Sequence, residues 1–173
     1  MPIIKSLRGF IPKIGANCFI AETAVIIGDV EIGDDCSIWY GAVIRGDVNS
    51  IRIGNRVNIQ DNAVLHTTYQ KTTIKMGDDV SVGHNVIVHG AEVHKGALLG
   101  MGSTVMDNSI IGEGAIVAAN ALVLENTKVE AGTIYAGVPA KFVKKVDPAL
   151  SRDMNERIAH NYLFYSGWYK EKE

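Results

Sequence analysis

The stretch IGANCFIAETAVIIGDVEIGDDCSIWYGAVI, residues 14–44, places an isoleucine at every sixth position. An amphipathic helix repeats about every 3.6 residues and a half-buried strand every 2, so neither pattern generates this spacing. The count continues to residue 135, with three extra residues before Ile53, five before Met76 and one fewer before Val93. The apolar positions are Ile14, Ile20, Ile26, Ile32, Ile38, Ile44, Ile53, Ile59, Leu65, Met76, Val82, Val88, Val93, Leu99, Val105, Ile111, Val117, Val123, Val129 and Tyr135.

A second position, four residues after each apolar one, is mostly small, as at Ala24, Ala63 and Ala97. Two inward positions in six residues indicate a parallel β-helix, in which each hexad supplies one short strand and a corner. Three hexads then close one triangular coil of about 18 residues, and equivalent positions stack about 4.7 to 4.9 Å apart. Glycine often follows the apolar residue, as at Gly33 and Gly54, which fits turns where a side chain would strain the backbone.

The 173 residues are expected to form a single domain, 1–173, with an all-β solenoid over 10–140 and a helix over 147–170. Asp147 and Pro148 are a typical helix start, and an apolar stripe follows at a spacing of three to four residues. We expect this helix to pack along a face of the solenoid, with residues 1–13 covering the opposite open end. The stripe comprises Leu150, Met154, Ile158, Asn161, Tyr165 and Trp168.

The balanced charge, 17 Lys and Arg against 19 Asp and Glu, gives no electrostatic reason to expect nucleic acid or a membrane as partner. No apolar stretch approaches the roughly 20 residues that cross a bilayer, and the N-terminus does not resemble a signal peptide. We therefore expect a cytoplasmic protein. Its two cysteines, Cys18 and Cys36, should be reduced thiols in contact at one inward position of successive coils.

Three histidines directly follow apolar positions of the repeat. His66 and His89 end the third hexad of successive coils, in one outward column with Arg45, whereas His94 lies beyond the next corner. Three imidazoles with an open fourth position form a catalytic zinc arrangement, in which the metal makes hydroxide available at neutral pH. Because one prism can hardly wrap all three around a metal, a neighbouring subunit would complete the set, and a triangular prism favours a trimer.

Each of these residues also has a plainer interpretation. Histidines outside a solenoid are usually solvated or interface residues, and Arg45 with Asp47 can be an ordinary ion pair. We assign no site to His84 or His160, and we interpret Trp39, Tyr40 and the terminal aromatic residues as packing.

Four segments resemble the gamma-class carbonic anhydrases and their bacterial relatives in the hexapeptide-repeat superfamily. They are IWYGAVIRGDV (38–48), NIQDNAVLH (58–66), VGHNVIVHGAEVH (82–94) and GALLGMGSTV (96–105). The resemblance implies a left-handed β-helix and a homotrimer with one divalent metal per subunit interface. It implies that His66 and His94 ligate from one subunit and His89 from the next.

The resemblance also implies roles for residues around the metal. Arg45 and Asp47 resemble the pair that ties subunits together beside the site, and Gln60 resembles the residue that orients metal-bound hydroxide, with Asp61 as its structural neighbour. Asn58 and Tyr135 resemble polar residues that line the pocket, where Tyr135 would be a hydrogen-bond partner for substrate. The implied activity is a lyase reaction, the reversible hydration of carbon dioxide to bicarbonate by metal-bound hydroxide.

The loop TTYQKTTIK, residues 67–75, departs from this pattern because it has no carboxylate where the family carries a proton-shuttling glutamate. We therefore expect slow turnover unless His84 or buffer removes the proton. The metal is expected to be zinc, with ferrous iron or cobalt as alternatives that three imidazoles also accept.

Other functions remain open for the same fold. AGVPAK, residues 136–141, resembles a segment near coenzyme A in hexapeptide acetyltransferases, and Lys141, Lys144 and Lys145 are the only basic cluster beside it. A metal-dependent acyl-CoA thioesterase would use the same three histidines. In a non-catalytic trimeric metal-binding module, the metal would be structural: it would hold the subunits together and would have no exchangeable water.

Overall fold

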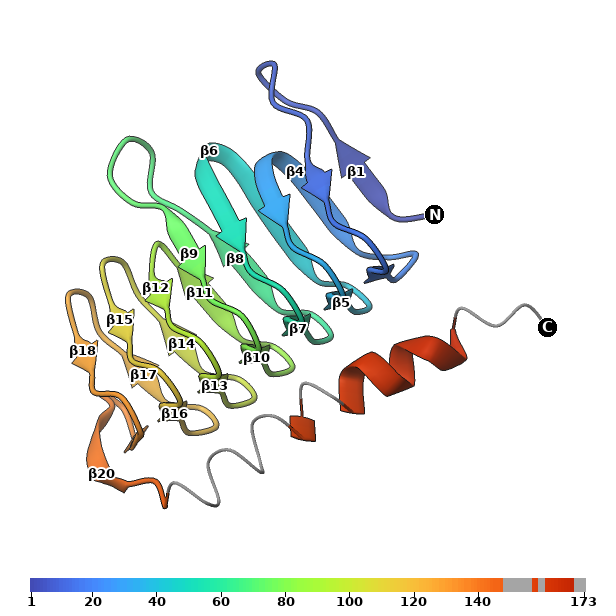
Figure 1. The fold of residues 1–173 in the computed structure, drawn as a ribbon. Helices are drawn as coiled ribbons and strands as arrows, with labels where there is room; N and C mark the ends of the chain where they lie inside the picture. Colours follow the sequence, from blue (N-terminus) through green and yellow to red (C-terminus); the bar gives the residue numbers. More distant parts are fainter. Residues whose placement is uncertain (148–156, 159–160, 170–173) are drawn as a thin grey trace.

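The structure, a computed structural model, describes residues 1–147, 157–158 and 161–169. It is a left-handed parallel β-helix of about seven turns followed by a C-terminal helix (Figure 1). The fold class predicted from the repeat is confirmed.

Two sheets form the walls of the solenoid. The larger sheet contains β1 (Ile3–Lys5), β2 (Lys13–Ile14), β4 (Val25–Ile32), β6 (Val43–Ile53), β8 (Val64–His66), β9 (Ile74–Met76), β11 (Ile87–His89), β12 (Glu92–Val93), β14 (Thr104–Val105), β15 (Ile110–Ile111), β17 (Leu122–Val123) and β18 (Lys128–Val129). The smaller sheet contains β3 (Phe19–Ile20), β5 (Ser37–Ile38), β7 (Asn58–Ile59), β10 (Ser81–Val82), β13 (Leu98–Leu99), β16 (Ile116–Val117), β19 (Thr133–Ala136) and β20 (Lys141–Lys145).

The larger sheet wraps around one corner, so the two sheets give three faces. Face A is the smaller sheet. Face B consists of β8, β11, β14 and β17 with the first halves of β4 and β6, and face C consists of β9, β12, β15 and β18 with β2 and the second halves of β4 and β6. Along the chain the faces follow in the order A, B, C, and each step to the next coil returns to the same face (Figure 1).

Both inward positions of the hexad are buried as the repeat predicts. Ile26, Ile44 and Leu65 are fully inaccessible, and so are their small partners Ala24 and Ala63. These side chains belong to one continuous core that runs the length of the solenoid. The core is narrow, so it is filled by β-branched residues and alanine rather than by aromatic rings.

The corners depend on residues that tolerate left-handed backbone, three positions after the inward apolar residue. At these positions φ lies between 54° and 61° in the non-glycine residues. Asparagine and aspartate adopt this conformation at least cost among residues with a side chain, which explains their recurrence. They are Asn17, Asp35, Arg56, Asn62, Asp79, Asn85, Asn108, Asn120 and Asn126.

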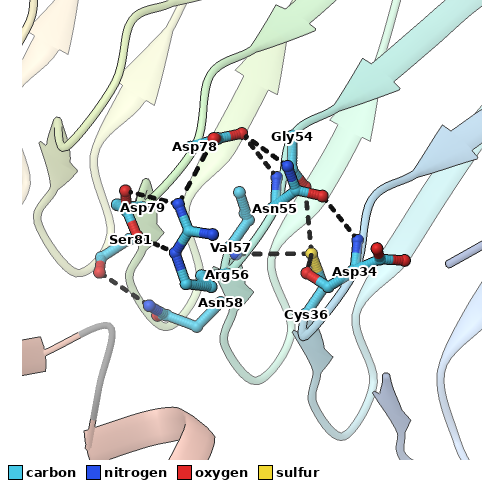
Figure 2. A network of polar contacts seen from close by, with 10 residues as sticks. All are labelled: Asp34, Cys36, Gly54, Asn55, Arg56, Val57, Asn58, Asp78, Asp79 and Ser81. Atoms are coloured by element: carbon cyan, nitrogen blue, oxygen red, sulfur yellow. Dashed lines mark hydrogen bonds and ion pairs between the residues drawn. The ribbon is translucent and has the colours of Figure 1, made fainter. Parts of the chain in front are cut away.

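One corner carries a ladder of side chains that bond the preceding coil. Asp34 Oδ1 accepts a hydrogen bond from the Ala16 N–H (2.7 Å), and Asn55 Oδ1 accepts one from the Asp34 N–H (2.8 Å). Asp78 Oδ1 continues the ladder by accepting from the Asn55 N–H at 2.8 Å (Figure 2). Each coil is thereby tied to the next outside the regular strand pairing.

Glycines such as Gly33 and Gly54 follow the inward apolar residues of face C in successive coils, and we call them the glycine column. The ladder explains this column, where the sequence predicted backbone strain. A Cβ at Gly33 would lie 2.5 Å from Asn55 Oδ1, and one at Gly54 would lie 2.5 Å from Asp78 Oδ1. Neither glycine has positive φ. The cause of the pattern is therefore the close approach of the next coil, and the strain explanation is wrong for these positions.

The two ends of the solenoid are covered differently. At the N-terminal end β1 pairs with β4, as expected for residues 1–13, while β20 pairs antiparallel with β19 at the other end. The predicted helix is helical at 157–158 and 161–168 and has a turn at 169, while residues 148–156, 159–160 and 170 of the predicted range lie outside the described residues. None of the helical segments that the structure describes is long and apolar enough to span a membrane.

The C-terminal helix packs against the N-terminal coils on face A. Tyr162 and Tyr165 contact the small cluster of Phe19, Ala21 and Trp39, which confirms packing for these aromatic residues. Inside the core, Cys18 and Cys36 are both thiols. A hydrogen bond with Cys18, together with burial, raises the pKa of Cys36, so this thiol stays protonated.

Candidate metal centre

His66 and His89 lie side by side at the corner where face B meets face C. They are the last residues of β8 and β11, and they are direct partners in the strand register. Their rings stand 3.2 Å apart, measured from His66 Nδ1 to His89 Nε2. The outward stacking predicted from the hexad count is confirmed.

A carboxylate holds the other ring nitrogen of each histidine. Asp47 Oδ1 lies 3.1 Å from His66 Nε2, and Asp107 Oδ1 lies 2.8 Å from His89 Nδ1. When these nitrogens carry the protons that the carboxylates accept, the lone pairs of His66 Nδ1 and His89 Nε2 face one another. Carboxylates in this position fix the tautomer and the orientation of metal-binding histidines.

The spacing of the two free nitrogens fits a shared metal ion. Two imidazole nitrogens bound about 2.0 to 2.1 Å from a tetrahedral zinc would be about 3.3 Å apart. The observed 3.2 Å matches that edge. The donor set therefore fits a divalent metal of the zinc type, and these two side chains would supply two of its ligands.

Electrostatics favours the neutral, metal-binding form of His66. Partial burial and the nearby Arg45 guanidinium lower the pKa of His66 from its ordinary 6.5, although the Asp47 carboxylate opposes them. Burial alone would raise the pKa of Asp47, but hydrogen bonds from Arg45 and His66 bring it below its usual value. At neutral pH the pair is thus an ionised carboxylate beside a neutral imidazole.

The loop that follows His66 is anchored to the same cluster. The Thr68 hydroxyl donates to Asp107 Oδ2 (2.6 Å) and the Thr72 hydroxyl to Asp107 Oδ1 (3.2 Å). Burial raises the pKa of Asp107, but bonds from Thr68 and His89 lower it to a net value below the ordinary one. The sequence analysis missed Asp107. Its position in the repeat, two residues after Val105 in the coil that follows His89, could have predicted that it lies near His89.

Arg45 and Asp47 form the expected ion pair, and a second arginine approaches the same aspartate. Arg8, from the N-terminal segment, donates to the Asp47 carbonyl oxygen (3.2 Å) and lies 5.9 Å from the centre of the Tyr69 ring. The rim of the site therefore joins the N-terminal segment, the long strand β6 and the loop after β8.

His94 lies elsewhere, at the corner between faces C and A. Its Nε2 is 2.9 Å from Glu92 Oε1, and the side chain is 44% exposed. It borders a shallow groove of about 630 Å³ that the glycine column leaves on face C. Among the residues that the structure describes, no three potential ligands come together within one chain.

The remaining predicted residues occupy other places in the fold. Asn58 and Gln60 lie on face A, buried and bonded to each other (2.9 Å), and Asn58 Nδ2 donates to Ser81 Oγ at 2.7 Å (Figure 2). Asp61 is at the corner between faces A and B, where Oδ2 pairs with His84 Nδ1 at 2.8 Å. Tyr135 packs on the end of the core and edge-on against Phe142. Within one chain none of these residues contacts His66 or His89.

A family model described as bacterial transferase hexapeptide (six repeats) matches residues 11–46 and 90–125. A carbonic anhydrase of Geobacillus kaustophilus is 48% identical over 168 residues, which cover 97% of this chain and 91% of that protein.

A mitochondrial gamma carbonic anhydrase 2 of Arabidopsis thaliana is 44% identical over 142 residues, 78% of this chain but only 50% of the plant protein. Among solved structures, a Bacillus cereus protein described as an acetyltransferase superposes with a TM-score of 0.92 at 41% identity, over 98% of this chain and 97% of that one.

Proposed function

Since the chain belongs to the gamma-class carbonic anhydrase-like proteins of the hexapeptide-repeat superfamily, we propose that it hydrates carbon dioxide reversibly to bicarbonate at a metal held between subunits of a homotrimer. The observation that carries this proposal is the His66–His89 pair, whose two free nitrogens are spaced as ligands of one tetrahedral ion.

The third ligand in the proposal is His94 of a neighbouring subunit. In one chain His66 stands beside His89, while a whole face separates it from His94. We therefore group the ligands as His66 with His89 from one subunit and His94 from the next, which differs from the grouping that the resemblance implies. The groove beside His94 offers a docking place for the rim of the metal site of a neighbouring subunit. The groove exists because the glycines of face C carry no side chains there.

When bound, a divalent metal would lower the pKa of a coordinated water to about 7 and so supply hydroxide at neutral pH. The chain's own residues prepare the ligands. Asp107 and Asp47 fix which ring nitrogens are protonated, and Arg45 keeps Asp47 ionised. We assign Gln60 and Asn58, which are buried on face A, to the support of the polar substrate side. Tyr135 lies four strands further along that face, so its proposed hydrogen bond to substrate would come from a separate position.

The loop after His66 sets the expected rate. It carries Tyr69 and Gln70 at its tip but no carboxylate, so no side chain there exports the proton that hydration releases. Proton transfer to buffer is then the slow step. We propose zinc as the metal, with ferrous iron and cobalt as the alternatives that this donor set accepts.

Acyl transfer or thioester hydrolysis is the second candidate. It is favoured by the solved relative described as an acetyltransferase and by the row of exposed lysines on β20, Lys141, Lys144 and Lys145, which suits nucleotide phosphates. The half-buried carboxylate partners of the histidine pair have no role in metal-free acyl transfer. A metal-dependent thioesterase would need them as much as an anhydrase does.

Stopped-flow measurement of carbon dioxide hydration tests the proposal. The protein should be loaded with zinc, or anaerobically with ferrous iron, and assayed in buffer concentrated enough to replace the missing shuttle. A rate that depends on metal and saturates with buffer supports the anhydrase. Full metal occupancy with no hydration, together with thiol release from acyl-CoA, would replace it by the thioesterase.

A further inference from the structure

A second hollow lies far from the histidine pair, between the C-terminal helix and the corner that joins faces A and B. Its volume is about 450 Å³, within the range of small-molecule sites. Six of the eight described residues that line it are aromatic. The lining comprises Trp39, Tyr40, Asp61, His84, Tyr162, Tyr165, Trp168 and Tyr169.

The solenoid side of the hollow is a single column of the repeat. Tyr40, Asp61 and His84 each lie two residues after the inward apolar residue of successive face A strands, so they stack at one corner. The repeat places a ring, a carboxylate and an imidazole next to one another there. The helix supplies the opposite wall.

The aromatic rings meet edge to face rather than in a stack. The planes of Trp39 and Tyr162 are inclined at 78°, those of Trp39 and Tyr169 at 87°, and those of Tyr162 and Tyr165 at 73°. These ring pairs are in direct contact, with centroids 5.3 to 5.8 Å apart, so they form a packed cluster. The hollow lies against this cluster, which we call the aromatic wall.

A hydrogen-bonded chain of three polar groups forms one side of the hollow. His84 Nδ1 lies 2.8 Å from Asp61 Oδ2, and the Tyr162 hydroxyl lies 3.3 Å from His84 Nε2. Burial and the Asp61 charge raise the pKa of Tyr162 to about 12, so the phenol keeps its proton at neutral pH. Both ring nitrogens of His84 thus face polar groups of the lining.

The charge of the lining selects the class of ligand. Among the described lining residues Asp61 is the only carboxylate, and none of them is a lysine or an arginine. Aromatic faces attract cations, and the attraction is strongest for cations that lose their hydration water easily. Methylated ammonium groups are positively charged and weakly hydrated, so they suit such a lining. A primary ammonium would leave most of its hydrogen bonds unmet against these rings.

We propose that this hollow is a binding site for a small quaternary ammonium compound, held against the aromatic wall of Trp39, Tyr162, Tyr165 and Tyr169 with Asp61 as counter-ion. The site is separate from the candidate metal centre and does not depend on the anhydrase proposal. The residues that the sequence assigned only to packing thus have a second role.

The chain carries its own probe, because its two tryptophans both line the hollow. The full-length protein should be titrated with choline chloride at constant ionic strength while tryptophan fluorescence is recorded. 3,3-Dimethylbutanol, a neutral compound of the same shape, is the matched control ligand. We expect a saturable change with choline and at least about tenfold weaker binding of the alcohol.

Two variants separate charge from ring contacts. Asp61→Asn should weaken choline binding about tenfold and leave the alcohol unaffected, whereas Tyr165→Leu should weaken both. Using two variants at different places keeps the test valid if one of them misfolds, which circular dichroism would reveal. Equal affinity for choline and the alcohol would overturn the proposal. So would the absence of any saturable change up to about 100 mM choline, where even a millimolar site would be full.

Discussion

His66 Nδ1 and His89 Nε2 stand 3.2 Å apart, and each ring is held on its far side by a carboxylate. When the carboxylates accept the protons of the outer ring nitrogens, the two inner nitrogens are both free to bind one metal ion. The carboxylates thereby set the ring orientation that metal binding uses.

Removing the carboxylate behind His89 should weaken metal binding without removing a ligand. Asp107→Asn keeps the shape but makes a poorer acceptor for His89 Nδ1–H, and we expect metal affinity to fall about 10- to 100-fold. Competition with a chromophoric chelator measures this. His84→Asn, at a different corner, should leave metal affinity unchanged, and an equal loss in both variants would contradict the assignment.

The glycine column should resist even a methyl group. Gly54→Ala places Cβ against Asp78 Oδ1 and the backbone of the next coil, so we expect the free energy of unfolding to fall by about 1 to 3 kcal/mol. Gly167→Ala, where no atom lies within 4 Å of the added Cβ, is the matched control and should be neutral or slightly stabilising. Denaturant unfolding at a fixed protein concentration compares them.

The corner ladder predicts a pH-dependent contribution from Asp78. Its pKa lies below the ordinary 3.8, chiefly because the Asn55 N–H donates to it and also because Arg56 is near. Because the pKa of Asp78 is lower in the folded than in the unfolded state, its ionised form stabilises the fold at pH values above the unfolded-state pKa. This contribution is lost as the pH falls through the folded-state pKa.

Asp78→Asn should therefore be less stable than the parent protein near pH 6, with the difference shrinking below about pH 4. Thermal unfolding across this range measures the difference. Glu125→Gln, an exposed position, serves as control and should show no such convergence. A stability difference between Asp78→Asn and the parent protein that stays constant down to about pH 2 would refute the electrostatic explanation.

A carboxylate grafted on the loop after His66 should speed proton export. Tyr69 is 52% exposed on a loop that Thr68 and Thr72 tie to Asp107, so Tyr69→Glu should fold and hold its charge near the site. We expect several-fold faster hydration in dilute buffer and no gain in concentrated buffer. If Tyr69→Gln gave the same acceleration, proton shuttling would not be the reason.

The hexad count predicted the solenoid, both inward positions and the stacking of His66 on His89, because periodicity alone determines which residues share a face. It could not give the handedness, which came from the resemblance. It also missed β20, since an antiparallel return strand has no place in the repeat. The reason for Gly54 was wrong, because close approach by Asp78 from the next coil is a contact that spacing within one coil does not reveal.

The candidate site was predictable in part for the same reason. His94 was expected beyond a corner from the other two histidines, and it lies there. Asp107 was not foreseen, because its contact with His89 depends on a side-chain direction at a turn. Gln60 and Asn58 bond to each other within one chain, and their contribution to catalysis stays a prediction.

Mixed trimers test the central claim most directly, since they reveal which histidines share a metal across a subunit boundary. His66→Ala and His94→Ala chains carrying different affinity tags should be coexpressed, and the trimers that contain both should be purified. If one subunit supplies His66 and His89 and the next supplies His94, about one site in three is intact in each mixed trimer. We predict that fraction of the parent metal content and hydration rate, and no recovery when His66→Ala is combined with His89→Ala. Recovery from the second combination and none from the first would contradict the account.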